Sequence, residues 1–411
     1  MTQIYPFRPY LVTPTEIANV AAPPYDSMSV QQRAAFGVDH PNNFINAMRS
    51  IEEFPDDQRP SLDQVLQQNS DALERLLREG FFALEPEHSY FVYQLQVNDH
   101  VQTGVVAEVP LAEFQAGLIR QHEDTRSGHE DRLFDYLGVV GANSSPICAA
   151  YPTDPEIDDI VAGITADSPW LDYTDDLEVC QRIWRVSDAK IQSALEECFE
   201  RIAVLYLTDG HHRIASAARH AKIRNLQKDV DGPWNYLLMD LLPAEQLQIL
   251  PFNRCVYDLG DLSEQAFLKS LSEVFSLEPW DIDGPGFRGP RSRGEFVLLL
   301  GGEGYRLAID PKQVPDHPVD GLDVSILQNL VLEPLLGIHD PRADPRLEYV
   351  TGESGMEGLR QQWQLGWQLV FACYPPSLEQ LMAVADADLR MPPKSTCFDP
   401  KARPGIFVRR C

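Results

Sequence analysis

Apolar positions recur along the chain with two different spacings, and these spacings predict the main elements. Ser61–Glu79 carries six apolar residues on one helical face, followed by Gly80 as a stop signal. Two pairs of alternating segments predict β-hairpins: Tyr90–Val97 with Val101–Val109, and Phe296–Leu300 with Tyr305–Ile309. The acidic, proline-bearing stretch Pro152–Asp176 interrupts the pattern and predicts a surface insertion. Helices and hairpins mixed in this way favour a mixed α/β fold, with helices packed on a mixed sheet.

The most informative stretch is IAVLYLTDGHHRIASAARHA, from Ile202 to Ala221. Ile202–Leu207 is a continuous apolar run, which predicts a buried strand, and apolar residues then recur at helical spacing from Ile214. Asp209 and Gly210 stand at the junction. Gly210 permits a tight turn, and the first N–H groups of the following helix are free to bind an anion. The pattern therefore predicts a phosphate cradle.

The same junction concentrates proton-transfer and cationic side chains, because His211, His212 and Arg213 follow Gly210 directly. Two interpretations are open at this point. Asp209 can be an ordinary helix N-cap with two solvated histidines behind it, or the cluster can carry phosphate chemistry.

The net charge limits the classes of partner. The chain of 411 residues has 62 acidic and 34 basic residues and a formal net charge of −28. Such a charge opposes binding to nucleic acids and to anionic membranes, so we expect a small-molecule substrate and no nucleic acid partner. Any anion site must be a local group of lysines, arginines and helix N-termini.

Cysteine usage and the apolar runs indicate the compartment. Seven cysteines without a CxxC pair argue against a disulfide scaffold or a structural zinc site. The first residues, MTQIYPFRPY, show no signal-peptide pattern, and no apolar run reaches membrane-spanning length. We therefore expect a cytoplasmic protein.

Three further stretches contain candidate site residues. In the proline-rich start of the chain these are Arg8, Tyr25 and Asp26, which can equally belong to a structural arm over the core. In the charged stretch after Ile119 they are Glu123, Asp124 and Thr125, with Glu123 and Asp124 as candidate Mg²⁺ ligands. A solvated charged loop is the alternative interpretation of this second stretch.

The third stretch is MPPKSTCFDPKARPG, from Met391 to Gly405. It places cations and hydroxyl groups on a proline-stiffened loop of an otherwise acidic chain, in a combination suited to phosphate or carboxylate binding. A basic tail in solvent is the alternative. The candidate anion ligands here are Lys394, Ser395, Thr396 and Lys401.

Four motifs in this order carry a resemblance: PFRP at Pro6–Pro9, APPYD at Ala22–Asp26, DGHHR at Asp209–Arg213 and MPPKST at Met391–Thr396. The chain resembles a widespread bacterial and archaeal family known as domain of unknown function 1015, over nearly its whole length. That family has no settled activity, so the resemblance supplies no function by itself.

The DGHHR turn is also similar to the turn of the ParB/sulfiredoxin-like superfamily, which includes free-serine kinases. This second resemblance implies a ParB/sulfiredoxin-like core in which the turn lies against nucleotide phosphates. It implies Asp209 as the base that deprotonates a substrate hydroxyl, and His211, His212 and Arg213 as phosphate contacts. The catalytic glutamate of those kinases has no certain match, and Glu123 is the candidate.

The leading hypothesis is a phosphotransferase that acts on a small hydroxylated metabolite such as free serine, with ATP or ADP and Mg²⁺. Phosphoryl transfer depends mainly on positioning and charge neutralisation, which this group of residues can supply. Two alternatives stay open. One is a phosphatase for phosphoserine-type monoesters, in which His211 or His212 acts as acid or nucleophile. The other is a non-catalytic nucleotide-binding regulatory protein of ParB-like type.

The order of the elements predicts two domains. The first is a catalytic core over 1–258 with an N-terminal arm and insertions, and the second is an α/β lobe over 259–411. We expect the tail of the second domain to return to the site, because Lys394 is useful to the chemistry only near Asp209. The oligomeric state does not follow from the sequence.

Overall fold

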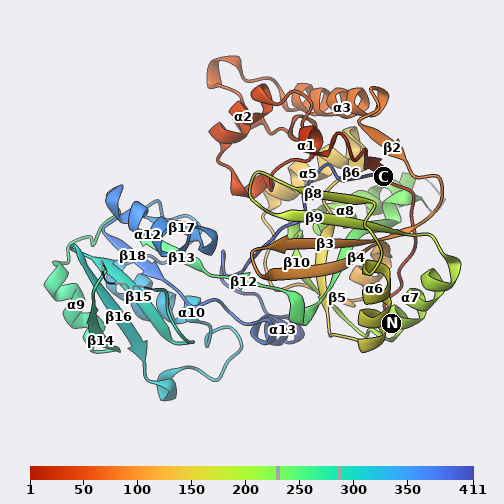
Figure 1. Ribbon diagram of the computed structural model, residues 1–411. Coiled ribbons are helices and arrows are strands. Elements are labelled where there is room, and N and C mark those ends of the chain that lie inside the picture. The colour runs from red at the N-terminus through yellow and green to blue at the C-terminus, as the bar shows by residue number, and fades with distance from the viewer. Residues whose placement is uncertain (228–231, 283, 285–287) are drawn as a thin grey trace. The chain divides into compact units, whose positions relative to one another are not determined.

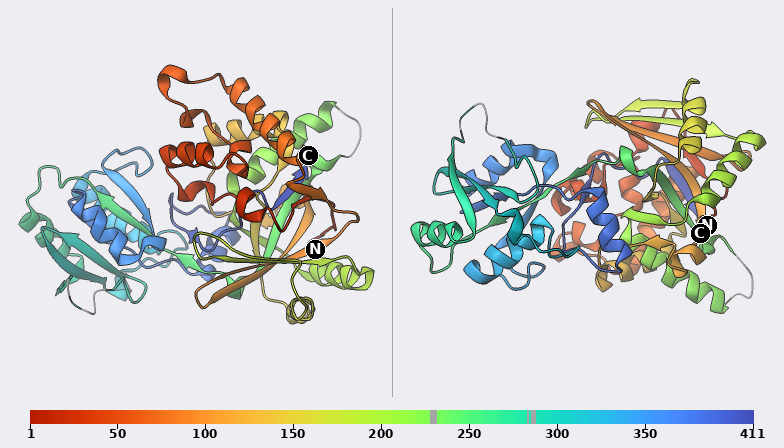
Figure 2. Two further views of the ribbon diagram at one scale, coloured as in Figure 1. Left: turned by 45° about the horizontal axis from the view of Figure 1, so that its top comes forward. Right: turned by 90° about the horizontal axis from the view of Figure 1, so that it is seen from below.

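The computed structural model describes residues 1–227, 232–282, 284 and 288–411, and the chain forms two compact units (Figure 1). Unit 1 comprises Met1–Arg120, Thr125–Leu247 and Pro400–Cys411, and unit 2 comprises Gln121–Asp124 and Gln248–Asp399. Both ends of the chain belong to unit 1 (Figure 2). The division into domains 1–258 and 259–411 stays a prediction.

Unit 1 is built on a mixed eight-stranded sheet. Its two parallel pairs are β10 with β5 and β11 with β7, and its other pairs are antiparallel. In spatial order the strands are β5 (Ile119–Arg120), β10 (Leu205–Asp209), β7 (Ile147–Tyr151), β11 (Tyr236–Pro243), β4 (His100–Pro110), β3 (Tyr90–Val97), β9 (Cys180–Val186) and β8 (Leu171–Thr174).

Each face of this sheet is covered by a separate apolar core. One core contains side chains of α6, α7 and α8, such as Ile157, Phe199 and Ile214, which are fully buried. The other contains side chains of α1, α3 and a small four-stranded sheet. The helices of unit 1 are α1 (Ile17–Val20), α2 (Val30–Asp39), α3 (Leu62–Arg78), α4 (Leu111–Gln115), α5 (Ser127–Val139), α6 (Pro155–Thr165), α7 (Ala189–Arg201) and α8 (His211–Gln227). The small sheet contains, in order, β2 (Phe82–Leu84), β1 (Tyr10–Val12), β20 (Phe407–Arg410) and β6 (Ala142–Asn143).

Unit 2 is a six-stranded antiparallel sheet with a helix layer on each face. On one face α12 packs through Leu359, and on the other face lie α9, α10 and the residues that follow α10. The strands in spatial order are β14 (Phe275–Trp280), β16 (Glu303–Ile309), β15 (Glu295–Leu300), β18 (Leu369–Ala372), β13 (Phe252–Val256) and β17 (Leu347–Thr351). The helices are α9 (Glu264–Ser272), α10 (Asp323–Leu327), a π-helical turn (Gln328–Leu332), α11 (Glu333–Leu336), α12 (Gly355–Gln364) and α13 (Leu378–Asp386). A separate two-stranded ribbon joins β12 (Ile249–Leu250) to β19 (Cys397–Phe398).

The predicted mixed α/β fold, both hairpins and the long helix over Ser61–Glu79 are confirmed. Two predictions were wrong in detail. The central strand begins at Leu205, because Ile202 caps the end of α7 through its N–H bond to Phe199 O (2.9 Å). The stretch Pro152–Asp176 is not merely a surface insertion, since it forms α6 and β8 and buries Ile157 in the core. Among the described helices, none combines the length and the apolar character that a membrane crossing requires.

Candidate functional site

The strand–turn–helix predicted at DGHHR forms within unit 1. Strand β10 ends at Asp209, Gly210 turns the chain with φ +98°, and α8 begins at His211. A positive φ of this size favours glycine, and a Cβ at this position would lie 3.1 Å from Arg213 Nε. Gly210 therefore allows both the turn and the close approach of Arg213.

A β-bulge aligns Asp209 with the neighbouring strands. In the pairing of β10 with β7, Leu207 lies opposite Ala149 and Asp209 lies opposite Cys148, so Thr208 is the extra residue. A bulge of this kind redirects the side chain that follows it. Cys148 in turn lies opposite Asp240 of β11. Asp209, Cys148 and Asp240 thus form one row across three adjacent strands.

Two cations hold Asp209 in its ionised form. Arg213, one helical turn further along, forms an ion pair with the Asp209 carboxylate, and Lys401 of the C-terminal segment adds its charge. Burial acts to raise the pKa of Asp209, but Arg213, Lys401 and the Gly210 N–H outweigh it and lower that pKa. Arg213 is itself held by the carbonyl oxygens of Ser145 (2.8 Å) and Pro146 (2.7 Å). The Asp209 side chain remains 41% exposed, so a ligand can reach it.

Asp240 is a functional candidate that the sequence analysis missed. It is 1% exposed, and among the described residues nothing donates a hydrogen bond to its Oδ1. Burial raises the pKa of Asp240 to about 7. Its carboxyl group occupies the space beside Gly104, where a Cβ would lie 2.9 Å from Asp240 Cγ. The signal was a single carboxylate inside the apolar strand sequence YLLMDLLP.

The two histidines of the turn differ in exposure and partners. His211 is 6% exposed, whereas His212 faces α5, where its Nδ1 accepts the Arg126 N–H (3.4 Å) and its ring lies 5.1 Å from that of His129. Thr125 donates to Glu130 in the first turn of α5. The start of α5 and the start of α8 therefore lie side by side.

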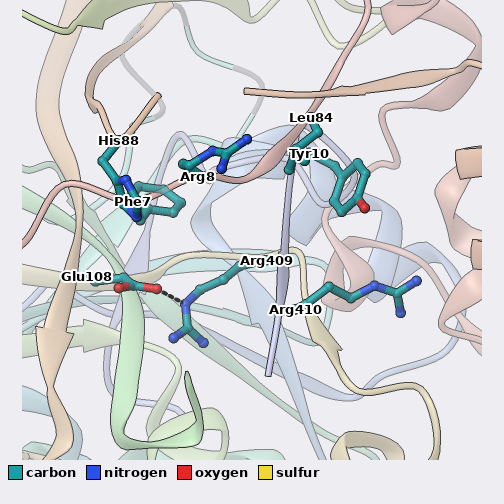
Figure 3. Close-up of a pocket in the computed structure, with 8 residues that line it drawn as sticks. All are labelled: Phe7, Arg8, Tyr10, Leu84, His88, Glu108, Arg409 and Arg410. Carbon is teal, nitrogen blue, oxygen red and sulfur yellow. Dashed lines mark hydrogen bonds and ion pairs between the residues drawn. The ribbon is translucent and has the colours of Figure 1, made fainter. Parts of the chain in front are cut away.

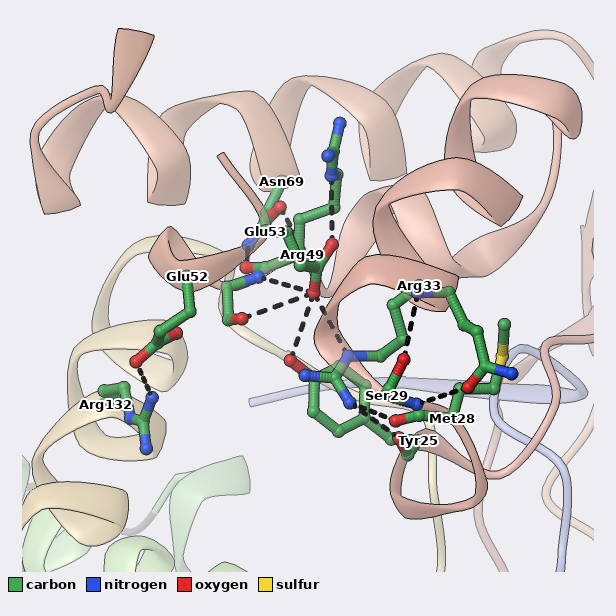
Figure 4. A network of polar contacts seen from close by, with 11 residues as sticks. Tyr25, Met28, Ser29, Arg33, Arg49, Glu52, Glu53, Asn69 and Arg132 are labelled. Carbon is green, nitrogen blue, oxygen red and sulfur yellow. Dashed lines mark hydrogen bonds and ion pairs between the residues drawn. The ribbon is translucent and has the colours of Figure 1, made fainter. Parts of the chain in front are cut away.

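The N-terminal candidates belong to other parts of unit 1. Tyr25 donates to Glu53 (3.2 Å), a fully buried carboxylate that also pairs with Arg33 (3.4 Å) and Arg49 (3.2 Å), as Figure 4 shows. Burial raises the pKa of the Tyr25 phenol. The side chain of Asp26 lies outside the described part of the chain. This network fixes the turn of the APPYD motif.

Arg8 lines a pocket of about 330 Å³ with Arg409, Arg410 and His88 (Figure 3). The Arg8 Nε donates to Glu85 O (2.9 Å), and Arg409 pairs with Glu108 at the pocket wall. No residue of the Asp209–Arg213 turn is among those that line this pocket. Arg8 as a phosphate or substrate contact stays a prediction.

The remaining candidates meet in unit 2, although more than 260 residues separate them in sequence. His122 O accepts the Met391 N–H (2.8 Å), and His122 Nε2 lies 3.1 Å from Thr396 Oγ1. Glu123 and Asp124 follow His122 directly. Ser395 is fully buried and donates to Pro392 O (2.6 Å), while Lys394 is exposed. The charged stretch and the MPPKST motif therefore form one cluster.

Asp124, one of the two predicted Mg²⁺ ligands, has cationic partners in unit 2. Asp124 lies 3.3 Å from Arg342 and 3.9 Å from Arg390, two cations that compete with a metal ion for the same carboxylate. Among the described residues, no group of three or more histidine, cysteine, aspartate or glutamate side chains is arranged to hold a metal. Mg²⁺ at Glu123 and Asp124 stays a prediction.

Comparison with solved structures shows weak likeness to several proteins. A free serine kinase in complex with AMP is 11% identical, with a TM-score of 0.37, over 74% of this chain and 91% of that one. SbnI from Staphylococcus aureus, truncated at its C-terminus, is 10% identical, with a TM-score of 0.38, over 73% of this chain and 85% of that one. A conserved hypothetical protein from Pyrococcus furiosus is 10% identical, with a TM-score of 0.35, over 74% and 94%. These scores are too low to transfer a fold or an activity.

Comparison with curated proteins gives no match. A family model, by contrast, matches residues 4–325, which is more than half of the chain. This match includes the first three of the four motifs, PFRP, APPYD and DGHHR. The chain therefore belongs to the family described as Protein of unknown function (DUF1015).

Proposed function

We propose that this protein is a phosphotransferase that moves a phosphoryl group between a nucleotide and a small hydroxylated metabolite, with free serine as the metabolite. The observation that carries the proposal is the Asp209 turn. An ionised, accessible carboxylate lies at a strand-to-helix junction beside Arg213 and Lys401. Phosphoryl transfer needs a proton acceptor for the hydroxyl and cations for the phosphate, and this turn offers both.

The cations also provide a way to activate the base only when substrate is bound. In the free protein, Arg213 and Lys401 keep the pKa of Asp209 low, which makes its carboxylate a weak base. A bound phosphate would share those two cations and offset their field at Asp209. The pKa of Asp209 would then rise, and its carboxylate would become a better acceptor for the hydroxyl proton.

The histidines have separate roles in this proposal. His212 lies at the surface shared by α5 and α8 and would contact the phosphate. His211 is buried and supports the first turn of α8. Cys148 lies next to Asp209 in the row, but burial raises the pKa of its thiol well above the usual value, with further contributions from Asp240 and Asp209. Its thiol therefore stays protonated and is not the nucleophile.

The test is phosphorus NMR of the protein with Mg²⁺ in three mixtures: ATP with serine, ADP with serine, and phosphoserine alone. New phosphoserine supports the proposal. Release of phosphate from phosphoserine alone would instead indicate a phosphatase, and nucleotide binding by calorimetry without any product would indicate a regulatory protein.

The diagnostic variant is Asp209→Asn. Loss of a general base lowers rates by about 10²- to 10⁴-fold, whereas nucleotide affinity should change little. Asp131→Asn is the matched control, because Asp131 also pairs with an arginine of α8, Arg219, but on the exposed surface. Near-normal turnover by Asp209→Asn would remove Asp209 as the base.

A further inference from the structure

The buried arginines of the described chain are balanced by carboxylates, with one exception. Four arginines are less than 9% exposed: Arg33, Arg254, Arg403 and Arg409. Three of them form ion pairs, with Glu53, Asp175 and Glu108 respectively. Arg254, which is 3% exposed, has no carboxylate partner among the described residues. Because an arginine cannot shed its proton in a protein, its positive charge remains uncompensated.

The position of Arg254 makes this charge costly. It lies in the middle of β13, opposite Tyr349 of β17 and Phe371 of β18, and it faces the main apolar core of unit 2. Its guanidinium group lies 5.0 Å from the Tyr349 ring and donates to the carbonyl oxygens of Phe252 and Pro393, the latter at 3.4 Å. These neutral contacts satisfy N–H groups but bring no negative charge.

A second cation lies at the same place. Lys394 follows Pro393 directly, and its Nζ lies 5.2 Å from the Phe252 ring. Both cations therefore contact Phe252, Arg254 through the carbonyl oxygen and Lys394 through the ring. Lys394 has no ion pair among the described residues. Its φ of +55° is unusual for a residue other than glycine, and such conformations concentrate at ligand sites. The end of the turn is held by the contact between His122 Nε2 and Thr396 Oγ1 (3.1 Å).

We propose that Arg254 and Lys394 form an anion-binding site at the Met391–Thr396 turn, and that this site takes the phosphate group of a small ligand. Two cations that both contact Phe252 match the charge of a phosphate, and Arg254 would gain the charge partner that the other buried arginines have. The net charge of −28 opposes binding of large polyanions, whereas a local pair of cations can still bind a small anion. All residues of the site belong to unit 2, and the site does not depend on the proposed activity.

The test is calorimetry of the full chain at constant ionic strength with inorganic phosphate, phosphoserine and ADP as probes. We expect Arg254→Met to weaken phosphate binding by about 10- to 100-fold, as the loss of a charge-assisted hydrogen bond predicts. Lys394→Met should weaken it as well. Arg346→Met is the matched control, since Arg346 is another arginine of unit 2 but is paired with Asp344, and its phosphate affinity should equal that of the wild type.

A thermal shift separates ligand binding from a purely structural role. Phosphate should raise the Tm of the wild-type protein and of Arg346→Met, but not that of Arg254→Met. If Arg254→Met does not fold, Lys394→Met replaces it in the test, because the Lys394 side chain is exposed and its substitution should not disturb the fold. The proposal is overturned if the wild-type protein binds none of the three probes, or if Arg254→Met and Lys394→Met both bind them as the wild type does. Neither calorimetry nor the thermal shift requires turnover. The anion site can therefore be present even if the protein shows no phosphotransferase activity.

Discussion

Asp209 and Asp240 occupy the same row of one sheet, yet their environments push their pKa values in opposite directions. Both lie opposite Cys148, on the two strands that flank β7. Asp209 has Arg213 and Lys401 beside it, and its pKa is lowered, whereas burial alone raises the pKa of Asp240 to about 7. At neutral pH the row therefore combines one ionised carboxylate with one that still holds its proton for much of the time.

The difference lies in elements outside the sheet. Arg213 comes from α8 and Lys401 from the C-terminal segment, and both reach the end of β10 but not the middle of β11. The sheet thus positions both carboxylates, while the helix and the tail decide which of them is charged. A pair of acids with separated pKa values is a common basis for dividing the roles of acid and base.

The largest expected effect is the pH dependence that Asp240 gives to the free energy of unfolding. In the folded state Asp240 keeps its proton up to pH about 7, whereas in the unfolded chain it loses it near pH 4. The folded state therefore loses stability as pH rises from about 4 to about 7, by about 4 kcal/mol in total, and the loss is complete above pH 7. Asp240→Asn should remove this pH dependence.

Urea unfolding at a series of pH values checks this prediction. The slopes of stability against pH are compared, so a constant offset caused by the buried amide of the variant does not matter. Asp175→Asn does not serve as a control, because Asp175 pairs with the buried Arg403. Asp131→Asn is suitable, since its carboxylate is exposed. Parallel curves for the wild type and Asp240→Asn would mean that Asp240 is ionised throughout, and the contrast with Asp209 would disappear.

A smaller effect on stability is expected when a methyl group at position 104 fills the space that the Asp240 carboxyl group occupies. A Cβ at Gly104 would overlap the Asp240 carboxyl group, so Gly104→Ala should destabilise the protein by about 1–3 kcal/mol. Replacing Asp240 by alanine removes the atoms that overlap, and the double variant should be more stable than the sum of the two single changes predicts. Additive free energies of unfolding would show that Gly104 has another role.

Some of this site could be predicted from the sequence because it depends on local pattern. The strand, the glycine turn and the helix at DGHHR are adjacent in sequence, and their order alone predicts the junction. The bulge at Thr208 could not be predicted, because it is a property of the pairing between β10 and β7. Without the bulge, alternation would direct Asp209 away from the side of Cys148 and Asp240.

The sequence analysis also missed two charged residues whose roles depend on partners distant in sequence. Asp240 and Arg254 were visible as charges within apolar strands, but their meaning depends on what surrounds them. Among the residues that the structure describes, no cation pairs with Asp240 and no carboxylate pairs with Arg254, and this is why both matter. The contact of Arg254 with Pro393 spans 139 residues. Lys394 lies near Phe252 within unit 2, and Lys401 acts on Asp209 within unit 1. The expected approach of Lys394 to Asp209 stays a prediction.

The smallest expected effects are changes in the pKa of Asp209 when one cation is removed. Arg213→Met and Lys401→Met should both raise this pKa, and Arg213→Met should raise it more, because Arg213 forms an ion pair with Asp209 and contributes the larger effect. Carbon-13 NMR titration of the aspartate carboxyl groups measures the shift, with the Asp209 signal identified by its absence in Asp209→Asn. Arg219→Met, which removes the partner of Asp131, should leave the pKa of Asp209 unchanged. If Lys401→Met has no effect on this titration, the C-terminal tail does not hold Asp209 ionised, and the contrast with Asp240 rests on α8 alone.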